Sequence, residues 1–495
     1  MACAALALAA CPVAAADVTV GVADDRGKYA EDGGAWFFST IRDAGMSENR
    51  MTVLWDPAQP TTIIERPFLN RALPTAAASG VRIVFAVYPT RASALTESAG
   101  APEQFAAFLQ LLARTYPQVK HFVIGNEPNL TRFWAPQFDP SGQQASGAAF
   151  VNVLARAYDA LKAVDPGITV IAAGLSERGN DNPLAPSNVS TSPVRFLRAM
   201  GLAYRASGRT APLMDMLDFH PYPESNEDPL TKEYAWPSVG YGNIDRLKQA
   251  VWDAFNGTGQ PTVEEGLKLR IGEIGWQVAT SGPGYTGAEN VPVTTSDRQA
   301  QLYGELLHLV ACDPAGGSVN FFGLVDAPQL ERWQAALVRV DGSRRPSFNA
   351  VRSALAETAG RCTGTRRAWR HATRVVGAGV EFGDLSRPRW WKQTSWGFKV
   401  TAAEEATYRA GIFRLPDATK KRSEAVAAIP RFLAGATPAQ AVLSASGTVT
   451  AHWKPQVKFP AKRLAPGSYV YAVSLGAAMN PARSSVFVSS PFRVK

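Results

Sequence analysis

Three consecutive stretches decide the fold: VRIVFAVYP at residues 81–89, EQFAAFLQLLARTY at 103–116 and VKHFVIGNE at 119–127. The first and third are almost continuously apolar, which is typical of strands buried on both faces of a parallel sheet. The middle stretch has apolar residues at the i, i+3, i+4 and i+7 spacing of an amphipathic helix. A strand, a helix and a second strand form a βαβ unit, so this segment predicts a parallel sheet with helices on its outer face.

The same alternation extends from about residue 18 to residue 357. Eight strands within one such region favour a (β/α)8 barrel over a doubly wound sheet. We therefore predict an α/β protein with a TIM barrel over residues 17–362. The further strands are expected at 18–25, 51–57, 168–176, 214–222, 267–276 and 318–326, and further helices at 148–164, 243–255 and 297–311.

The character of the sequence changes after the barrel region. A basic linker, TGTRRAWRHATR at 363–374, precedes short alternating strands such as WGFKVTA (396–402) and TYRAGIFRL (407–415). Regular turns separate these strands, and no long helical pattern interrupts them. This is typical of an antiparallel, immunoglobulin-like β-sandwich, which we predict over residues 375–495.

The first residues predict export. Residues 1–16 are small and apolar and end in AAA (14–16), a pattern that signal peptidase cleaves. The run LAAC (8–11) also resembles a lipoprotein box, which would leave a lipid anchor on Cys11. We favour a plain signal peptide, and either interpretation predicts an extracellular protein. The mean hydropathy of −0.10 argues against several membrane-spanning segments, and none is expected.

Few residues of the chain are suited to redox or metal chemistry. Beyond the N-terminal segment only Cys312 and Cys362 remain, and in an exported protein such a pair favours a disulfide. The five histidines are scattered without a Cys/His cluster, which argues against a metal site. No phosphate-cradling glycine loop follows a strand, so no nucleotide cofactor is implied and no cofactor is expected.

Charge is distributed unevenly along the chain. Residues 364–495 contain 21 Lys and Arg against 6 Asp and Glu, a net charge of +15, whereas the whole chain carries +9. A basic domain on an acidic body favours docking to an anionic partner such as a cell-envelope polymer, with a merely solvated surface as the alternative. No nucleic-acid-binding motif accompanies this charge, so nucleic acid is disfavoured. Three tryptophans of the domain would form either a sugar-binding face or its core: Trp390, Trp391 and Trp396.

Two carboxylates stand at the ends of expected strands. The fourth strand runs into GNEP (125–128) and the seventh into GEIGW (272–276). Chemistry in a barrel belongs to the carboxyl ends of the strands, and strands 4 and 7 lie across the mouth from each other, so Glu127 and Glu273 are expected to share a pocket. Glycoside hydrolysis needs such a pair, with one carboxyl protonated and the other ionised. A rim salt bridge would explain either residue alone, but it explains the pair less well.

These motifs resemble those of a known group of enzymes. The N-E-P on strand 4 and the E-x-G-W on strand 7 resemble glycoside hydrolase clan A, the retaining (β/α)8 glycosidases, with family five and family thirty-nine the most similar types. The resemblance covers residues from about 18 to 357. It implies a glycoside hydrolase that cleaves O-glycosidic bonds by double displacement, with Glu127 as acid/base and Glu273 as nucleophile. It further implies that Asn126 binds the sugar 2-hydroxyl.

Three further positions fit the same resemblance. Tyr222, in FHPYP, resembles the tyrosine that hydrogen-bonds the nucleophile and keeps it ionised. His220, two residues earlier, would contact the sugar or the surroundings of the nucleophile. Arg50 opens RMTVLW, as family-five members carry an arginine on strand 2 near the nucleophile.

The end of strand 8 departs from the family pattern. Many clan members have a tryptophan there beneath the sugar, whereas this chain reads NFFGLVDAP (320–328), with Trp333 further along. The floor of the subsite would then come from Phe322 or Trp276. Other aromatic residues at or after strand ends would either stack on sugars or pack in the core, and Trp134 is the leading candidate platform. These residues are Trp55, Tyr88, Phe133 and Trp134.

Two other functions use the same fold. A transglycosylase would employ the same residues, and a non-catalytic barrel anchored at the cell envelope would bind glycans without cleaving them. The presence of both glutamates, the asparagine and the tyrosine disfavours the non-catalytic barrel. Serine hydrolase chemistry lacks support because the chain has no G-x-S-x-G nucleophile elbow.

Overall fold

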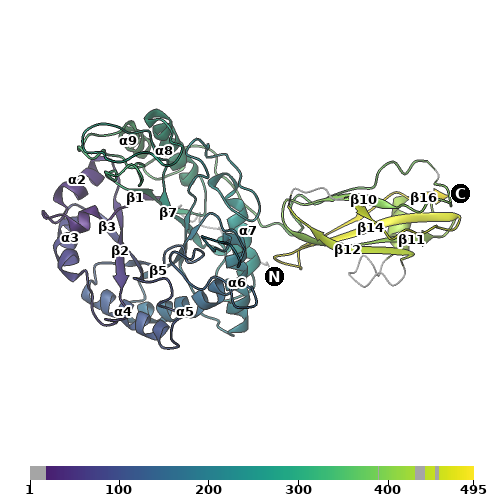
Figure 1. Ribbon diagram of the computed structural model, residues 1–495, viewed down its shortest axis with the longest axis horizontal. Coiled ribbons are helices and arrows are strands. Elements are labelled where there is room, and N and C mark those ends of the chain that lie inside the picture. The colour runs from purple at the N-terminus through teal and green to yellow at the C-terminus, as the bar shows by residue number, and fades with distance from the viewer. Residues whose placement is uncertain (1–17, 388, 430–440, 452–455) are drawn as a thin grey trace, which may run out of the picture.

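The structure of the protein is a computed structural model that describes residues 18–387, 389–429, 441–451 and 456–495. The predicted signal peptide at 1–16, including the alternative lipidation site, lies outside the described residues. Figure 1 shows a ring of helices around a barrel of strands, with an elongated domain of strands beside it. The chain thus has two differently built domains.

Among the described residues, eight parallel strands pair in sequence order and close into a barrel when β8 pairs with β1. This confirms the predicted (β/α)8 fold. Strand β3 is buried at almost every position, because it has strands on both sides and helices outside. The strands are β1 (Thr19–Ala23), β2 (Glu48–Trp55), β3 (Arg82–Pro89), β4 (His121–Ile124), β5 (Thr169–Ser176), β6 (Met216–His220), β7 (Lys268–Ile274) and β8 (Gly316–Phe322).

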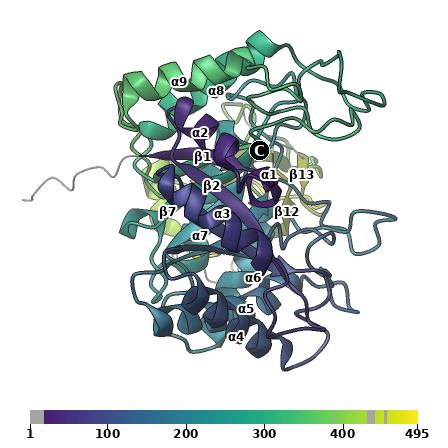
Figure 2. The same ribbon diagram turned by 90° about the vertical axis from the view of Figure 1, so that its left-hand side faces the viewer.

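Helices cover the outside of the barrel, and Figure 2 shows one of them, α3, in front of β2. Each main helix turns one apolar side inward. In α4 this side includes Phe105, Phe108, Leu109 and Leu112, at the spacing of a single helix face. The helices are α1 (Arg26–Tyr29), α2 (Ala35–Asp43), α3 (Arg66–Ala78), α4 (Ala101–Thr115), α5 (Ser146–Val164), α6 (Pro193–Ala206), α7 (Asp245–Phe255), α8 (Ser296–Ala311) and α9 (Pro346–Thr358), with short turns η1 (Tyr241–Asn243) and η2 (Val263–Glu265).

The second domain is an antiparallel β-sandwich, as predicted. In the part of it that the structure describes, β13, β10 and β9 form one sheet, and β12, β11, β14, β15 and β16 form the other. Trp396 belongs to the core between them: it is 2% exposed, and its Nε1 donates to the carbonyl of Lys462 at 2.8 Å. The elements are β9 (Gly379–Glu381), β10 (Gly397–Thr401), β11 (Ala406–Leu415), α10 (Arg422–Ala428), β12 (Leu443–Val449), β13 (Gln456–Lys458), β14 (Gly467–Ala477), β15 (Ser484–Val488) and β16 (Phe492–Val494).

The sandwich is attached to the helical wall of the barrel by a buried arginine. Arg483 donates to both oxygens of Asp253 in α7, at 2.9 and 2.8 Å, and to both oxygens of Glu404, at 2.7 and 2.6 Å. Nearby, the ring of His371 stacks on Trp252 of α7, with the centroids 4.1 Å apart. Since α7 lies on the outside of the barrel, the sandwich extends sideways and leaves the strand ends uncovered (Figure 1).

The predicted disulfide between Cys312 and Cys362 is present, with the two Cα atoms 4.4 Å apart. It ties the residue that follows α8 to the segment that leads into the sandwich. The last barrel helix ends at Thr358 and the first sandwich strand begins at Gly379, and the predicted linker lies between these two residues. In the described ranges, no helix combines the length and the apolar character that a membrane span requires.

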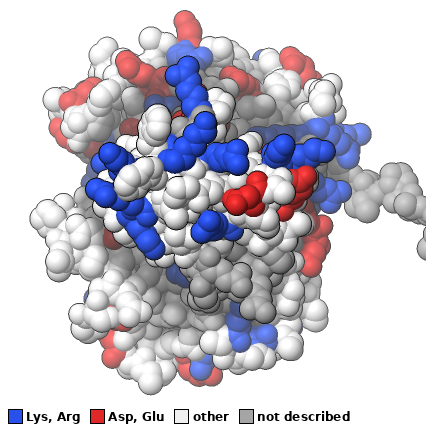
Figure 3. Space-filling model, turned by 90° about the vertical axis from the view of Figure 1, so that its right-hand side faces the viewer, with Lys and Arg blue, Asp and Glu red and all other residues white. Residues whose placement is uncertain are grey.

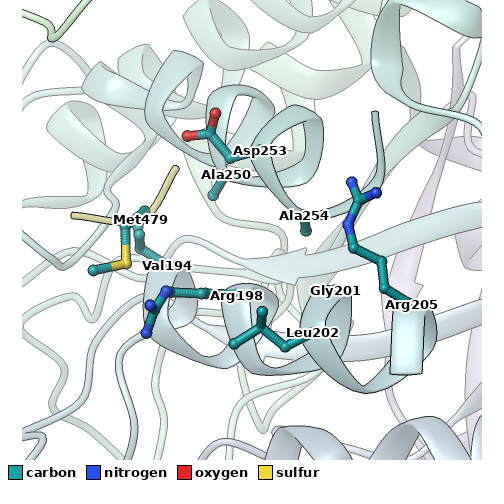
Figure 4. Close-up of a pocket in the computed structure, with 9 residues that line it drawn as sticks. All are labelled: Val194, Arg198, Gly201, Leu202, Arg205, Ala250, Asp253, Ala254 and Met479. Carbon is teal, nitrogen blue, oxygen red and sulfur yellow. The ribbon is translucent and has the colours of Figure 1, made fainter. Parts of the chain in front are cut away.

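A small cavity lies on the flank of the barrel, where α6, α7 and the loop containing Met479 meet (Figure 4). Its volume is about 40 Å³, and charged groups from Arg198 and Asp253 border it. A cavity of this size holds a few water molecules and is far too small for a sugar. The candidate chemistry must therefore be sought elsewhere, at the ends of the strands.

Candidate active site

Glu127 stands where the chain turns sharply after β4. Gly125 and Glu127 have φ values of 88° and 40°, so the backbone leaves the strand conformation at once. A positive φ in a residue with a side chain costs of the order of 1–3 kcal/mol and is typical of functional sites. The N–H of Glu127 donates to the carbonyl of Gly174 in β5 at 2.9 Å. The neighbouring strand thereby holds the glutamate in a conformation that its own preference would not select.

Glu273, in β7, receives two strong hydrogen bonds. Nη1 of Arg50 donates to Oε1 at 2.6 Å, and the hydroxyl of Tyr222 donates to Oε2 at 2.9 Å. Burial and then the negative charge of Glu273 raise the pKa of Tyr222 well above its usual value, so the hydroxyl keeps the proton that it donates. The carboxylate is 12% exposed and faces the barrel mouth from a fixed position. Each of its two oxygens therefore accepts a hydrogen bond from a different side chain.

His220, the last residue of β6, lies between the two glutamates. Its Nδ1 is 3.2 Å from Oε1 of Glu127 and 3.8 Å from Oε2 of Glu273. Burial alone would lower the pKa of this imidazole, but the carboxylate of Glu273 together with Asp218 and Glu127 raises it to about 10. The two candidate catalytic carboxylates therefore share one cationic neighbour, and their oxygens are no farther apart than the sum of these two distances.

Asn126 is oriented by the same arginine that holds Glu273. Nη2 of Arg50 donates to Oδ1 of Asn126 at 2.7 Å, and the asparagine side chain is nearly buried. Since Oδ1 accepts from the arginine, the Nδ2 amino group is directed away from it, and no described residue accepts from that group. Arg50 thereby couples the orientation of the amide to that of the carboxylate. Five of these six residues were expected at strand ends and Arg50 at the start of a strand, and the structure brings all six together.

A buried carboxylate beneath the site escaped the sequence analysis. Asp218, in β6, is fully buried, and its oxygens lie 3.8 Å from Nε2 of His220 and 4.0 Å from Nε of Arg50. A Cβ atom at Gly272 would overlap this carboxylate, so the glycine beside Glu273 is required by packing. Asp218, His220 and Tyr222 share the period of two along MLDFHPY, and this spacing was the signal that could have revealed it.

Glu177, directly after β5, was also missed. It is 2% exposed, its Oε2 accepts from Oγ of Ser176 at 2.8 Å, and its Oε1 is 3.3 Å from Nε of Arg178. Burial raises the pKa of its carboxyl to about 7, and the negative charge of Glu127 adds to that rise. The residue was overlooked because it follows a strand that carries no recognisable motif.

A partly exposed tryptophan packs against Tyr222, the residue that donates to Glu273. Trp333 is 38% exposed, and its ring centroid lies 4.9 Å from that of Tyr222 and 5.4 Å from that of Phe322. Strand β8 itself ends without a tryptophan, and this indole comes from the loop that follows it. Trp333 presents a flat apolar surface beside the tyrosine that contacts Glu273, which is the surface that a sugar ring needs.

Three tryptophans that were expected to contact substrate pack in the core instead. Trp55 is fully buried against Phe105, and Trp134 is 2% exposed against Phe150. Trp276 is also 2% exposed, and its Nε1 donates to the carbonyl of Asp228. Indoles buried to this extent offer no face to a sugar, so the expectation for Trp134 as the leading platform is corrected. The two remaining aromatic candidates, Tyr88 and Phe133, are half-buried and pack edge to face.

Comparison with known proteins adds structural matches at low sequence identity. No family model and no curated protein matches the chain. A family 39 glycoside hydrolase from Bacteroides cellulosilyticus is 14% identical with a TM-score of 0.48, covering 90% of this chain and 80% of that one. A family 5 enzyme from Streptomyces cattleya, solved with Manβ1-4GlcNAc, is 16% identical with a TM-score of 0.49, covering 74% and 86%. A family 39 β-xylosidase from Caulobacter crescentus is 16% identical with a TM-score of 0.44, covering 91% and 94%.

The functional argument therefore rests on the site itself. Across the described ranges, no group of three or more His, Cys, Asp or Glu side chains is arranged to hold a metal ion. The site presents two carboxylates in different surroundings around one histidine. Glu273 has two donors and a fixed position, whereas Glu127 has an oxygen, Oε2, that no described residue binds. Such a pair can divide nucleophilic attack and proton transfer between its members.

Proposed function

We propose that the protein is a secreted retaining glycoside hydrolase that cleaves O-glycosidic bonds of an oligo- or polysaccharide. One observation carries the proposal: Glu127 and Glu273 approach the same nitrogen of His220 but have different donors. The hydrogen bonds from Arg50 and Tyr222 hold Glu273 in the fixed position that a nucleophile needs. The unbound oxygen of Glu127 suits a group that must exchange a proton with a ligand.

The two carboxyl groups would act in two displacements. In the first, an oxygen of Glu273 forms a bond to the anomeric carbon while the bond to the leaving oxygen breaks and Glu127 gives that oxygen its proton. In the second, Glu127 takes a proton from water, and the water oxygen attacks the anomeric carbon and releases Glu273 as a carboxylate. Each displacement inverts the anomeric carbon, so the product has the configuration of the substrate. Glu127 ends the cycle protonated, as it began.

Two neighbours would position the reacting groups. Arg50 fixes Glu273 and at the same time turns the amino group of Asn126 away from itself, toward the place of a sugar 2-hydroxyl. A hydrogen bond to this hydroxyl strengthens as the transition state forms. Trp333 would support the sugar ring from the rim. Export through residues 1–16 belongs to the proposal as well, since a polysaccharide substrate would be met outside the cell.

The test is a chemical rescue of Glu273→Ala on a panel of aryl glycosides. The variant is expected to lose at least about 10³-fold in rate, because the nucleophile is removed. Added azide should restore turnover and yield a glycosyl azide of inverted configuration. Glu224→Ala removes an exposed carboxylate from the loop after β6 and serves as the matched control, with an unchanged rate expected.

Several outcomes would overturn the proposal. An active wild type whose rate survives Glu273→Ala would remove Glu273 from the mechanism. Azide products of retained configuration from that variant would exclude its role as nucleophile. Transfer of sugar to added acceptors without release of free sugar would make the protein a transglycosylase, and binding of oligosaccharides with no turnover would make it a glycan-binding barrel.

A further inference from the structure

The end of the sandwich that lies far from the barrel carries an exposed aromatic and basic surface. Trp390 is 72% exposed and Trp391 is 43% exposed, the former the most exposed tryptophan of the described chain. Figure 3 looks onto this end of the molecule and shows that Lys and Arg side chains far outnumber Asp and Glu there. We call this surface the distal patch and define it by six residues: Arg389, Trp390, Trp391, Lys392, Arg463 and Arg493.

The backbone holds the distal patch in place. The N–H of Arg389 donates to the carbonyl of Arg493 at 2.7 Å, and the N–H of Trp391 donates to the carbonyl of Lys495 at 2.8 Å. A turn follows, in which the N–H of Gln393 donates to the carbonyl of Trp390 at 2.9 Å. The two indoles are therefore carried by a segment that pairs with the strand end at β16, and they are displayed on a fixed support.

Trp390 and Trp391 do not pack in the core of the domain. Trp396, the third indole of the same stretch, fills the core, whereas no described aromatic ring packs against Trp390. Trp391 is instead flanked by cations: Nζ of Lys392 lies 5.6 Å from its ring centroid and Cζ of Arg463 lies 5.8 Å from it. Cations at these distances are attracted to the indole face. Exposing two large indoles beside each other is unfavourable unless a ligand covers them.

Within the described residues, the charge of the distal patch is offset only by the attraction between Arg389 and the carboxylate of Asp384, without an ion pair. Among the described residues, none of its four cations forms an ion pair with an Asp or Glu side chain. The nearest acid along the chain, Asp384, uses Oδ1 to accept from the N–H and hydroxyl of Ser386, while Arg389 donates to the backbone carbonyl of Asp384 and not to its carboxylate. The positive charge therefore remains available to a partner.

We propose that the distal patch binds an anionic polysaccharide, with sugar rings against Trp390 and Trp391 and acidic groups against the surrounding cations. Indoles match the flat apolar faces of sugar rings. The guanidinium groups of Arg389, Arg463 and Arg493 can each take a carboxylate or a sulfate through two parallel hydrogen bonds. An acidic polymer offers both kinds of group at regular intervals. A lipid surface fits less well, because the two indoles are bracketed by cations and leave no continuous apolar area to insert.

The test measures retardation of the purified full-length protein in native gels that contain a polymer. Polygalacturonate presents carboxylates, dextran sulfate presents sulfates, and dextran is the neutral counterpart. We expect retardation by at least one acidic polymer, none by dextran, and weakening by salt. Trp390→Ala with Trp391→Ala should weaken the binding at least about tenfold. Which acidic polymer retards the protein then identifies the acidic group.

Matched variants separate the distal patch from general charge and from the barrel. Trp36→Ala removes a tryptophan of α2 that is 50% exposed and should leave retardation unchanged. Arg463→Gln should weaken binding, whereas Arg409→Gln, an exposed arginine of β11, should not. Glu273→Ala should bind like the wild type, so failure of the proposed hydrolase activity would not affect this result. Unchanged melting temperatures establish that the variants fold.

Three results would overturn the proposal. The first is an absence of retardation by both acidic polymers. The second is an equal loss in Arg463→Gln and Arg409→Gln, which would reduce the effect to net charge. The third is binding to vesicles of phosphatidylglycerol and phosphatidylcholine in place of the polymers, which would make the distal patch a lipid-binding surface.

Discussion

At the scale of single residues, the buried carboxyl group of Glu177 interacts electrostatically with Glu127, the candidate acid/base. A carboxyl group whose pKa is higher in the folded chain than in the unfolded chain takes up protons on folding. The pKa of Glu177 is raised from 4.5 to about 7, so its protonated form supports the folded state below pH 4.5 and that support is lost as the pH rises to about 7. Ionised Glu177 then remains as a buried charge at alkaline pH.

This argument predicts the behaviour of Glu177→Gln. The variant should melt at nearly the same temperature as the wild type near pH 4. It should become the more stable protein as the pH rises, by about 3 kcal/mol above pH 8, since each pKa unit corresponds to about 1.4 kcal/mol. Thermal unfolding across this pH range measures the difference. Glu103→Gln, on the surface of α4, should show no such trend, and a pH-independent difference for Glu177→Gln would contradict the explanation.

The sequence allowed some residues of the site to be predicted and hid others. Glu127 and Glu273 were found because glycines flank them at strand ends, where a carboxylate has no role in packing. Asp218 has no such context, and its importance comes from enclosure by two arginines and a histidine that converge only in the closed barrel. Trp134 failed as a substrate platform because loop length does not reveal whether an indole points outward or into the core.

At the scale of elements, the loops after β4 and β5 are joined by one asparagine. Asn129 is fully buried, and its Nδ2 lies within hydrogen-bonding distance of three backbone carbonyls, those of Ser176, Arg178 and Thr191, at 2.9–3.2 Å. Its Oδ1 accepts from the N–H of Ser176 at 3.0 Å. The asparagine thus holds the turn that carries Glu127 against the end of β5.

We expect Asn129→Ala to reduce kcat at least about tenfold, with a smaller effect on KM, because small displacements of a catalytic group are costly. The melting temperature should also fall, since buried carbonyls without donors cost about 1–3 kcal/mol. Steady-state kinetics on the best aryl glycoside measures the first effect and calorimetry the second. Gln104→Ala, on the exposed side of α4, should change neither. A variant that lost stability but kept kcat would show that Asn129 has no positioning role.

Strand ends and irregular helices account for the differences between predicted and observed elements. The fourth strand was expected to reach residue 127 but ends at Ile124, because Gly125 adopts a positive φ. The eighth was expected to reach residue 326 but ends at Phe322, before Gly323 with a φ of 85°. Helix α3 was not singled out because Pro74 interrupts its pattern. Apolar periodicity predicts the centre of an element well, whereas its end depends on single backbone angles.

At the scale of the whole molecule, the junction between the domains depends on Arg483. Arg483→Ala would leave Asp253 and Glu404 as buried carboxylates without a cation, at a cost of about 3–5 kcal/mol. We expect the connecting segment to become sensitive to protease. We also expect the variant to unfold in two thermal transitions, in contrast to a single transition in the wild type. Arg409→Ala is the control with equal charge loss. Unchanged protease resistance of Arg483→Ala would mean that other contacts hold the junction.

The sandwich was predictable as a fold but not as a docked body. Alternating strands indicate its two sheets directly, and the charge of residues 364–495 is visible in the composition. Nothing local distinguishes Arg483 from the other basic residues of the domain, because its importance arises from two acids that are distant in the sequence. The exposure of Trp390 beside the burial of Trp396 is likewise a property of the folded sheet.

The sideways attachment of the sandwich has a consequence for how a long polymer would be processed. Arg483 fixes the sandwich to the barrel wall. A polymer bound at the far end of the sandwich would therefore be cleaved about one domain length away from the point where it is bound. The enzyme would then cleave the polymer only within a short range of each binding point. It would move along the polymer only after the sandwich dissociates. The polymer would be cleaved into fragments of similar length, and a weakened junction between the two domains would make the fragment lengths uneven.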